Sequence, residues 1–368
     1  MKAIAVRPGH ARSIHLTDIA EPTLDQIPGG SGVLARVLAV GVDATDREID
    51  AAEYGEAPPG SDVLVLGHES LCRVLQVGPN VMGLQPGDLV VFTVRRPGGS
   101  LYDQMGLPDL TTDDHYFERG ISRRQGFLTE RVVDAAEFAV KVPESLGILG
   151  VLLEPTSVVE KAIRQAYAIQ QRLGVWRPRR AIVLGAGPLG LIATMALRVR
   201  GLEVATFARS QQPYLNADLV NALGARYVSA QDQDLASLAD SLGNVDLMVE
   251  ATGFSPLVFE AMERLGRNGV LVLTGIAGGD RQADAVHADH ILQGFVLGNK
   301  VVVGSVNAAR TDFERGVSDL VMAEALWSGW LSRLLTHRVA GLERHDEMIR
   351  LLTSATDAIK IVVDVSEP

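Results

Sequence analysis

The sequence predicts a two-domain α/β protein in which an antiparallel β-barrel precedes a doubly wound parallel sheet. Three observations lead to this fold class. The chain has 368 residues, enough for two compact domains. Residues 1–150 are rich in short β-type runs broken by Gly and Pro, which is typical of antiparallel sheets. Residues 155–305 instead alternate β-type runs with helical stretches, which is typical of βαβ units.

Composition and charge exclude several classes of protein. Hydrophobic residues make up 47% of the chain and charged residues 21%, which disfavours a disordered, collagen-like or coiled-coil protein. The formal net charge of -11 would repel nucleic-acid phosphates and anionic lipids. The sequence contains no apolar run long enough for a membrane span and no signal-like start. We therefore expect a cytoplasmic protein with neither a nucleic-acid nor a membrane partner.

The first region is expected to form the barrel from five β-type runs, at 32–43, 63–69, 72–78, 87–94 and 127–143. Its single cysteine, Cys72, excludes an intrachain disulfide framework and a multi-cysteine zinc knuckle, and we expect it to be buried packing. Any metal must therefore be bound by His, Asp and Glu. The long polar segment 95–126 is predicted to be a lid or lobe bordering a cleft.

The second region is expected to form a six-stranded parallel sheet from the runs 180–187, 202–210, 225–230, 245–253, 269–275 and 300–307. From about residue 310 a helical segment leads to a last strand, 359–365. The alternating pattern of that strand suits an edge of the first domain.

The strongest local motif is GAGPLG, at 185–190, between the first of these strands and an apolar helix. Gly185 permits a tight turn, Gly187 lets the backbone approach a pyrophosphate, and Gly190 allows close helix packing. The helix start, with Pro188 and Leu189, offers free N–H groups to an anion. An ordinary Gly-rich turn is the alternative, but strand, motif and helix in this order favour a dinucleotide site.

The end of the second strand of this sheet bears on the choice of coenzyme. An NAD site would normally place Asp or Glu there, whereas this chain has Ala208, Arg209 and Ser210. A guanidinium and a hydroxyl can bind the 2'-phosphate of NADP, which a carboxylate would repel. We expect NADP, with NAD as a weaker coenzyme; a solvated surface arginine is the alternative.

Three metal-ligating clusters lie outside the predicted nucleotide domain, namely Asp43, His68 with Glu69, and Glu154. Each cluster alone is weak evidence for a metal site. Taken together with the dinucleotide motif, they make the chain resemble the zinc-dependent medium-chain dehydrogenases, and within them the archaeal-type glucose dehydrogenases. Asp at the position of Asp43 resembles the halophilic branch of these enzymes. The segments that carry this resemblance are 41–49, 66–69, 86–97, 116–121, 154–162, 250–253 and 297–307.

The resemblance implies a GroES-like β-barrel catalytic domain over 1–154 and 308–368 and a Rossmann NADP-binding domain over 155–307. It implies one catalytic zinc and no structural zinc, and a homo-oligomer, either a dimer or a tetramer. The implied metal ligands are Asp43, His68, Glu69 and Glu154. Thr45 is implied as a proton relay or hydroxyl contact, and the substrate contacts are Thr45, Glu118, Glu154 and Asn307. The coenzyme contacts implied in addition to the residues above are Thr252, Thr274, Gly275, Ile276, Ser305, Val306 and Asn307.

The function implied is NADP- and zinc-dependent oxidation of an aldose, D-glucose or also D-galactose, at C1 to the aldonolactone. In that chemistry zinc acts as a Lewis acid on the C1 hydroxyl and hydride passes to nicotinamide. Two alternatives stay open: another zinc-dependent polyol or alcohol dehydrogenase on the same scaffold, and a metal-free NADPH-binding reductase or module.

Overall fold

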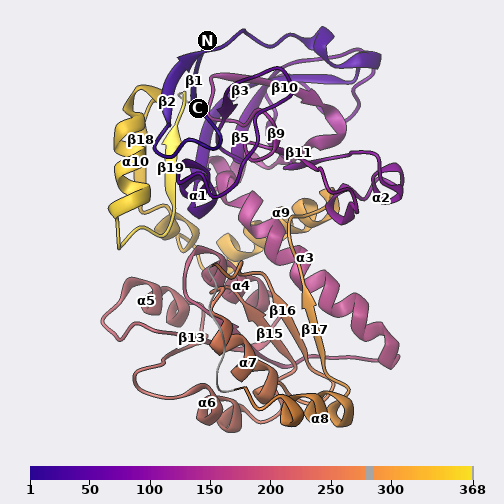
Figure 1. Cartoon of the computed structure of the whole chain (residues 1–368), viewed down its shortest axis with the longest axis vertical. Coiled ribbons are helices and arrows are strands. Elements are labelled where there is room, and N and C mark those ends of the chain that lie inside the picture. Colours follow the sequence, from indigo (N-terminus) through magenta and orange to yellow (C-terminus); the bar gives the residue numbers. More distant parts are fainter. Residues whose placement is uncertain (279–285, 367–368) are drawn as a thin grey trace. The chain divides into compact units, whose positions relative to one another are not determined.

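The computed structural model of the chain describes residues 1–278 and 286–366 and divides into two compact units. Unit 1 comprises Met1–Ser157, Asn307–Val321 and Leu331–Pro368, and unit 2 comprises Val158–Val306 and Met322–Trp330. Figure 1 shows the strands of unit 1 coming from both ends of the chain, in indigo and yellow. Each unit is described by itself below.

Unit 1 is built on two antiparallel-type sheets. A seven-stranded sheet has the order β11-β6-β5-β3-β19-β18, with β10 also paired to β3, and a three-stranded sheet has the order β2-β1-β4. The strands of these sheets are β1 (Lys2–Val6), β2 (His15–Asp18), β3 (Gly32–Val42), β4 (Leu64–Val65), β5 (Glu69–Val77), β6 (Leu89–Phe92), β10 (Arg131–Ala135), β11 (Ala139–Val142), β18 (His337–Ala340) and β19 (Ile361–Asp364). The central strand β3 is almost entirely buried because it pairs with β5 on one side and, on the other, with β10 over its first half and β19 over its second. This pairing fixes the residues at both of its ends.

The polar segment 95–126 folds as a lobe of unit 1. A small sheet in the order β7-β8-β9 carries it, and a short helix and a 3-10 turn fill the connection. Its elements are β7 (Arg95–Arg96), α2 (Leu101–Gln104), β8 (Phe117–Arg119) and β9 (Arg123–Arg124). Asp103 links this connection, because its Oδ2 accepts hydrogen bonds from the hydroxyls of Ser100 and Thr111, both at 2.7 Å.

The expectation that the last strand would lie at an edge is wrong. β19 lies inside the seven-stranded sheet, antiparallel to β3 and parallel to β18, so β18 forms that edge instead. The sequence pattern predicts a helical region before β19 because α9 (Arg310–Leu326) and α10 (His345–Ser354) make up most of it. The four-residue strand between them is too short to show a pattern.

Unit 2 contains the six predicted parallel strands. They are β12 (Arg180–Leu184), β13 (Glu203–Ala208), β14 (Arg226–Ser229), β15 (Leu247–Glu250), β16 (Val270–Leu273) and β17 (Val301–Gly304). Their spatial order, β14-β13-β12-β15-β16-β17, is the 3-2-1-4-5-6 order of the Rossmann fold. The strand order reverses beside β12, so the carboxyl end of β12 is the expected place for a dinucleotide.

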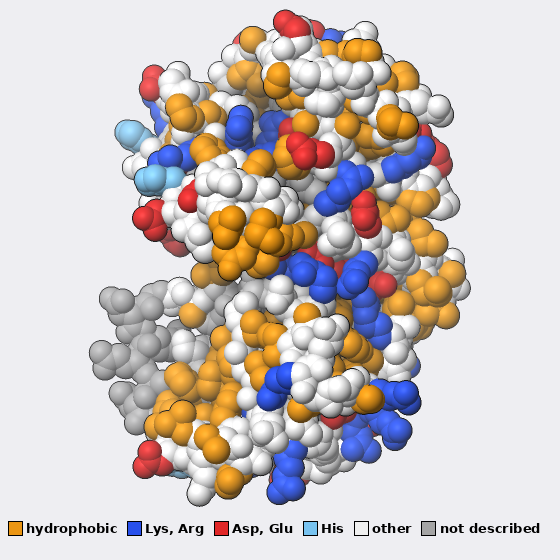
Figure 2. All heavy atoms as spheres, turned by 90° about the vertical axis from the view of Figure 1, so that its right-hand side faces the viewer, with side chains coloured by type: hydrophobic (Ala, Val, Ile, Leu, Met, Phe, Trp, Pro, Cys, Tyr) orange, Lys and Arg blue, Asp and Glu red, His pale blue; other side chains and the backbone are white. Residues whose placement is uncertain are grey.

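Helices follow most strands of unit 2. They are α4 (Pro188–Val199), α5 (Leu215–Ala222), α6 (Leu235–Leu242), α7 (Ser255–Arg264) and α8 (Ala288–Gly298). Most apolar residues of the first three, α4 to α6, are buried. α3 (Leu153–Gln170) begins in unit 1 and continues into unit 2. In the described part of the chain, no helix combines the length and apolar character needed to cross a bilayer. Figure 2 shows exposed hydrophobic side chains in several separate patches among charged ones.

Candidate active site

The predicted metal ligands come together in unit 1 at the ends of three elements. Asp43 is the N-cap of α1 (Ala44–Asp50), directly after β3, and His68 and Glu69 stand where β5 begins. Glu154 lies in the first turn of α3. The ligand atoms form two overlapping groups that share His68: Asp43, Asp46 and His68 in one, and His68, Glu69 and Glu154 in the other, with all atoms of a group within 4.8 Å of one another.

The start of α1 fixes the first of these carboxylates. Asp43 Oδ1 accepts the N–H of Thr45 at 2.8 Å, while Asp46 Oδ2 accepts the N–H of Asp43 at 3.1 Å, which is a reciprocal capping arrangement. Asp46 Oδ1 also accepts the N–H of Gly67 at 3.1 Å and so joins α1 to the turn before His68. Asp43 Oδ2 remains directed to the imidazole, 3.9 Å from His68 Nε2.

Glu69 is held by a buried lysine from the last part of the chain. Lys360 Nζ lies 2.5 and 2.7 Å from the two carboxylate oxygens of Glu69, and both side chains are about 2% exposed or less. Gly41, opposite Glu69 in β3, leaves room for this pair, since a Cβ there would lie 1.9 Å from Glu69 Oε2. Burial lowers the pKa of Lys360, but the carboxylates of Glu69 and Asp43 outweigh it and the pKa is raised. Lys360 therefore contacts Glu69 directly, whereas Asp43 and Glu154 interact with the ammonium only at longer range.

The pKa values in this cluster record an excess of negative charge. Burial and the neighbouring Glu69 and Asp43 raise the pKa of Glu154 to about 8, although His68 opposes the shift. Burial likewise raises the pKa of Asp46 to about 6. Burial would lower the pKa of His68, but the surrounding carboxylates, Asp43 and Glu154 first, raise it to about 9.

We call Asp43, Asp46, His68, Glu69, Glu154 and Lys360 the metal cluster. Its four carboxylates face one imidazole and one ammonium, so a divalent cation would complete the charge balance. Carboxylate oxygen and imidazole nitrogen are suitable zinc ligands. The buried Nδ1 of His68 also has no hydrogen-bond partner among the described residues. The two groups that share His68 therefore offer residue types that fit a zinc ion.

The predicted sugar-binding residues Glu118 and Asn307 contact each other in unit 1. Glu118, in β8, is buried, and its Oε1 accepts from Asn307 Nδ2 at 2.6 Å and from Arg95 Nε and Nη2 at 3.0 and 2.9 Å. Arg95 also lies over the ring of Tyr116. Three donors thus converge on one oxygen of Glu118. Within residues 1–278 and 286–366, no protein donor is recorded for the other oxygen, Oε2.

The Gly-rich motif forms the expected turn at the carboxyl end of β12. Gly185 has φ +106, and a Cβ on Gly190 would lie 2.1 Å from the Gly185 carbonyl oxygen, so only glycine permits this close approach. Gly187 is the N-cap of α4 and its Cβ direction meets no atom within 4 Å. Pro188 and Leu189 open α4. The turn therefore leaves open space before the N-terminus of a helix, as an anion site requires.

A cavity of about 660 Å³ in unit 2 begins at this turn. Its lining includes Gly185, Gly187, Ala208, Arg209, Ser210 and Thr252 of the predicted coenzyme residues, together with apolar side chains from α6 and α7. Arg209 is exposed, and in the described ranges its guanidinium has no recorded hydrogen bond or ion pair. Many other arginines of this chain are paired, so a free guanidinium at this cavity is available to an anion.

The remaining predicted coenzyme residues follow the ends of β15, β16 and β17. Glu250 organises two of these loops: its side chain accepts the N–H of Thr252 at 2.6 Å, and its carbonyl accepts the Thr274 hydroxyl at 2.6 Å and the Gly275 N–H at 3.1 Å. Ile276 and Val306 are 81% and 58% exposed. In the described part of the chain the buried hydroxyl of Ser305 has no hydrogen-bond partner. These loops present apolar surface and an unused hydroxyl.

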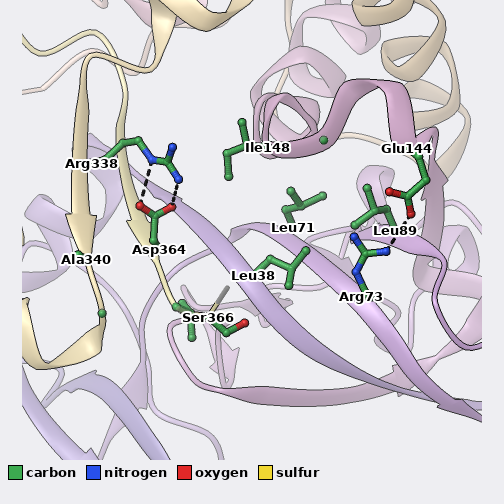
Figure 3. A pocket seen from close by; sticks show the side chains of 13 residues that line it. Leu38, Leu71, Arg73, Leu89, Glu144, Ile148, Arg338, Ala340, Asp364 and Ser366 are labelled. Carbon is green, nitrogen blue, oxygen red and sulfur yellow. Dashed lines mark hydrogen bonds and ion pairs between the residues drawn. The ribbon is translucent and has the colours of Figure 1, made fainter. Parts of the chain in front are cut away.

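A different cavity, of about 720 Å³, lies on unit 1 and contains none of the predicted site residues. Figure 3 shows Leu38, Leu71 and Ile148 between two ion pairs. Arg338 with Asp364 forms one pair, at 2.6 Å, and Arg73 with Glu144 forms the other, at 2.9 Å. Because its charges are already paired, this cavity offers no chemistry for oxidation.

Three residues of the site were not predicted from the sequence. Asp46 follows Asp43 at the spacing of a capping box, and that signal could have been used. Lys360 is a lone cation in an apolar strand, which signals a buried partner without naming it. Arg95 had no local signal, because its partner Glu118 lies far along the chain.

Comparison with known protein families assigns nearly the whole chain. Residues 29–144 match the family described as alcohol dehydrogenase GroES-like domain. Residues 147–365 match the family described as glucose dehydrogenase C-terminus. The predicted fold class, a GroES-like barrel with a Rossmann domain, is confirmed by these matches and by the strand order of unit 2.

The individual relatives span the same length. The glucose 1-dehydrogenase of Methanocella arvoryzae is 40% identical over 367 residues, covering 99% of both chains. The glucose 1-dehydrogenase of Thermoproteus tenax is 40% identical, also over 99% of both chains. Among solved structures, Haloferax mediterranei glucose dehydrogenase in complex with NADP, Zn and gluconolactone has a TM-score of 0.87 and 34% identity, and the match covers 100% of both chains.

Proposed function

The chain belongs to the glucose dehydrogenase family of zinc-dependent medium-chain dehydrogenases, and from that premise we propose that it oxidises D-glucose, and also D-galactose, at C1 to the aldonolactone with NADP as coenzyme. The observation that carries this proposal is the metal cluster, in which four carboxylates surround His68 and Lys360 is the one ammonium. The related Haloferax structure contains NADP, Zn and gluconolactone, in agreement with this reaction.

The metal ligands we assign are Asp43, His68 and Glu154. Glu69 is better described as a neighbour whose charge is held by Lys360. The chemistry supplied by the two bound groups is Lewis-acid polarisation of the C1 hydroxyl by zinc and acceptance of a hydride by NADP. The part of the protein is to hold these groups and the sugar in position and to remove the hydroxyl proton.

We assign Thr45 as the first relay of that proton: its hydroxyl oxygen would accept the proton while its own proton passes to Tyr54 and that of Tyr54 to Glu48. The backbone N–H of Thr45 is fixed by Asp43 Oδ1, so its half-buried side chain lies beside the metal cluster. Burial raises the pKa of Tyr54, and a hydrogen bond with Thr45 opposes that shift. The Tyr54 hydroxyl donates to Glu48 Oε2 at 3.1 Å. This arrangement leads from the cluster toward a partly exposed carboxylate.

We propose that Glu118 and Asn307 recognise the sugar hydroxyls by hydrogen bonding. Arg95 and Asn307 occupy Oε1 of Glu118, which leaves Oε2 to accept a sugar hydroxyl. A site built to hydrogen-bond a hydroxyl rejects analogues that lack it much more strongly than an apolar pocket rejects a missing methylene. This preference distinguishes an aldose enzyme from one that acts on simple alcohols.

In unit 2 we assign the pyrophosphate to the turn 185–190 and the 2'-phosphate to Arg209 and Ser210. NAD, which lacks this phosphate, is the weaker coenzyme. We place the nicotinamide at the loops 274–276 and 305–307, where backbone and the Ser305 hydroxyl are available. Under this assignment unit 1 is catalytic and unit 2 binds NADP.

We further propose a homo-oligomer, a dimer or a tetramer, formed through the sheet of unit 2. β17 is its edge strand, and α8 exposes Leu292, Val296 and Leu297 at 63%, 77% and 73%. An unpaired edge beside exposed apolar residues favours pairing with a second copy. Light scattering tests this, because Val296→Asp should give monomers. Since the coenzyme is a diffusible metabolite regenerated inside cells, we propose a cytoplasmic location.

A substrate panel tests the proposed reaction. Aldoses, polyols and primary alcohols would be assayed with NADP and with NAD, before and after chelation. We expect glucose with NADP to give the highest kcat/KM and chelation to remove it. A polyol or alcohol as best substrate would favour the first alternative, and full activity without metal would favour a metal-free reductase.

A further inference from the structure

We propose that Tyr227 and Gln231 are positioning residues that set the choice between NADP and NAD. They would act by holding the backbone of Arg209 and Ser210 in the conformation that receives the 2'-phosphate. This inference rests on the proposed binding of that phosphate after β13, and it places part of coenzyme selectivity on the neighbouring strand, β14.

Three consecutive carbonyl groups, of the last residue of β13 and of the two residues that follow it, accept hydrogen bonds from β14 and the turn after β14. The N–H of Ala230 donates to the carbonyl of Ala208 at 2.8 Å. The side-chain amide of Gln231 donates to the carbonyl of Arg209 at 3.0 Å, and the hydroxyl of Tyr227 donates to the carbonyl of Ser210 at 2.7 Å. The Ser229 hydroxyl also donates weakly to the carbonyl of Arg209, at 3.5 Å. The carbonyls of Arg209 and Ser210 are therefore held by side chains.

These bonds also orient the amide N–H groups of the loop. In a trans peptide the N–H points opposite to the preceding carbonyl, so the N–H groups of Ser210 and Gln211 are directed away from β14. Neither N–H has an acceptor among the described residues. Two free N–H groups beside the unpaired guanidinium of Arg209, at a cavity that Arg209 and Ser210 line, make a concavity suited to a phosphate.

Tyr227 is suited to this task because it is a stable donor. Its ring is half-buried and packs edge-on against Tyr214, which lines the coenzyme cavity. Burial raises the pKa of Tyr227 to about 12, so its hydroxyl keeps the proton that it donates at neutral pH. Removing the hydroxyl would release the Ser210 carbonyl while leaving the ring in place.

The experiment compares Tyr227→Phe and Gln231→Ala with a matched control, Gln233→Ala. Gln233 lies in the same turn, but its side chain accepts from Arg226 and does not reach the loop after β13. Dissociation constants of NADPH and NADH are measured by fluorescence, and those of adenosine 2',5'-bisphosphate and 5'-AMP by competition. The second pair isolates the 2'-phosphate from the rest of the coenzyme.

We expect each test variant to weaken NADPH and adenosine 2',5'-bisphosphate by about two- to tenfold, the size of one neutral hydrogen bond, with NADH and 5'-AMP unchanged. Gln233→Ala should change none of the four. Equal weakening of both members of each pair, or no change, would overturn the inference.

Arg209→Ala separates the inference from the function on which it rests. If Arg209→Ala lowers the NADP preference and the two positioning variants do not, the inference is wrong and the role of Arg209 stands. If the positioning variants lower the preference and Arg209→Ala does not, the backbone reads the phosphate and only the role of Arg209 falls. If none of the variants changes the preference, both assignments are wrong.

Discussion

Unit 1 contains two clusters of buried charges that differ in how completely the protein satisfies them. The arginine cluster consists of Arg95, Arg96, Arg119, Glu118 and Asp134. Arg96 donates to Asp134 and to Thr93, and Arg119 donates to Asp134 and to two backbone carbonyls. Both guanidinium groups also lie over aromatic rings. In the metal cluster, by contrast, carboxylates outnumber cations and the buried His68 Nδ1 has no partner in the described ranges.

The difference teaches which buried charges need an external ion. Burying a charge is costly unless it is paired and hydrogen-bonded, and the arginine cluster meets that condition with its own residues. It does so in and beside the lobe 95–126, through Asp134 and the pair of Glu118 with Arg95. The metal cluster leaves carboxylates unmatched, so it is the one place in this comparison where a divalent cation adds stability and chemistry together.

The largest expected effect is the loss of turnover when the metal cluster is broken. His68→Ala removes a ligand, and because Lewis-acid polarisation contributes several kcal/mol we expect kcat/KM for glucose to fall by about 10⁴-fold or more. Metal content, measured by atomic spectroscopy, should fall with it. NADPH affinity should stay unchanged, because the coenzyme cavity is formed by unit 2 alone. Full activity in this variant or in metal-stripped enzyme would rule out the proposed mechanism.

The next largest effect concerns the arginine cluster. Asp134→Asn leaves Arg96 and Arg119 without their shared buried carboxylate, so we expect the free energy of unfolding to fall by about 3–5 kcal/mol. Chemical denaturation measures this loss. Glu21→Gln is the matched control, since its pair with Arg131 is exposed and should contribute less than about 1 kcal/mol. A similar loss in both variants would contradict the distinction between buried and exposed pairs.

The arginine cluster should also determine part of the acid sensitivity. Burial would raise the pKa of Asp134, but Arg119 and Arg96 outweigh it and hold the pKa well below its usual range. Because the folded-state pKa is depressed, this stability is fully present above the unfolded value of about 3.9 and is lost as pH falls below it. We expect on the order of 2 kcal/mol to disappear there. Thermal unfolding between pH 5 and 2 should lose this component in Asp134→Asn, and an unchanged acid response would disprove the assignment.

The smallest expected effect is on turnover of the sugar and concerns Glu118, within the arginine cluster. Glu118→Gln keeps an acceptor near Arg95 but places an amide at the other position, so kcat/KM for glucose should fall by about tenfold, or about 1.4 kcal/mol. NADP affinity should not change. A set of deoxy-glucoses locates the hydroxyl concerned: the wild type should discriminate against one analogue, and the variant should not. Equal discrimination by both enzymes would remove Glu118 from the sugar site.

Local patterns were sufficient to predict most of the fold. The six strands of unit 2 could be predicted because each combines an apolar run with a Gly-rich end, and GAGPLG marks the reversal of strand order. β18 was missed and β19 misplaced, because β19 pairs with β3, from the opposite end of the chain, and β18 pairs only with β19, so neither position follows from the strand's own pattern. Such pairing has no local signature.

The candidate site shows the same division between local and distant information. Asp43, His68 and Glu154 stand in short motifs, so the sequence could place them in one hypothesis, and their ligand atoms lie in overlapping groups. The residues that restrain this site were not foreseen. Lys360 fixes Glu69, and Arg95 fixes Glu118, through contacts that exist only after folding. Motifs therefore identify the chemistry, whereas the supporting partners have to be read from the structure.

The pairing of Lys360 with Glu69 has a consequence for synthesis of the protein. The two residues are 291 positions apart, and β19 inserts between β3 and β18. While the chain emerges from the ribosome, the segments bearing Asp43, His68 and Glu154 appear well before the ammonium that neutralises Glu69. Until then the barrel lacks an internal strand and carries an uncompensated carboxylate. Synthesis of β19, rather than completion of the ligand motifs, is therefore the point at which a settled site for the metal ion first exists.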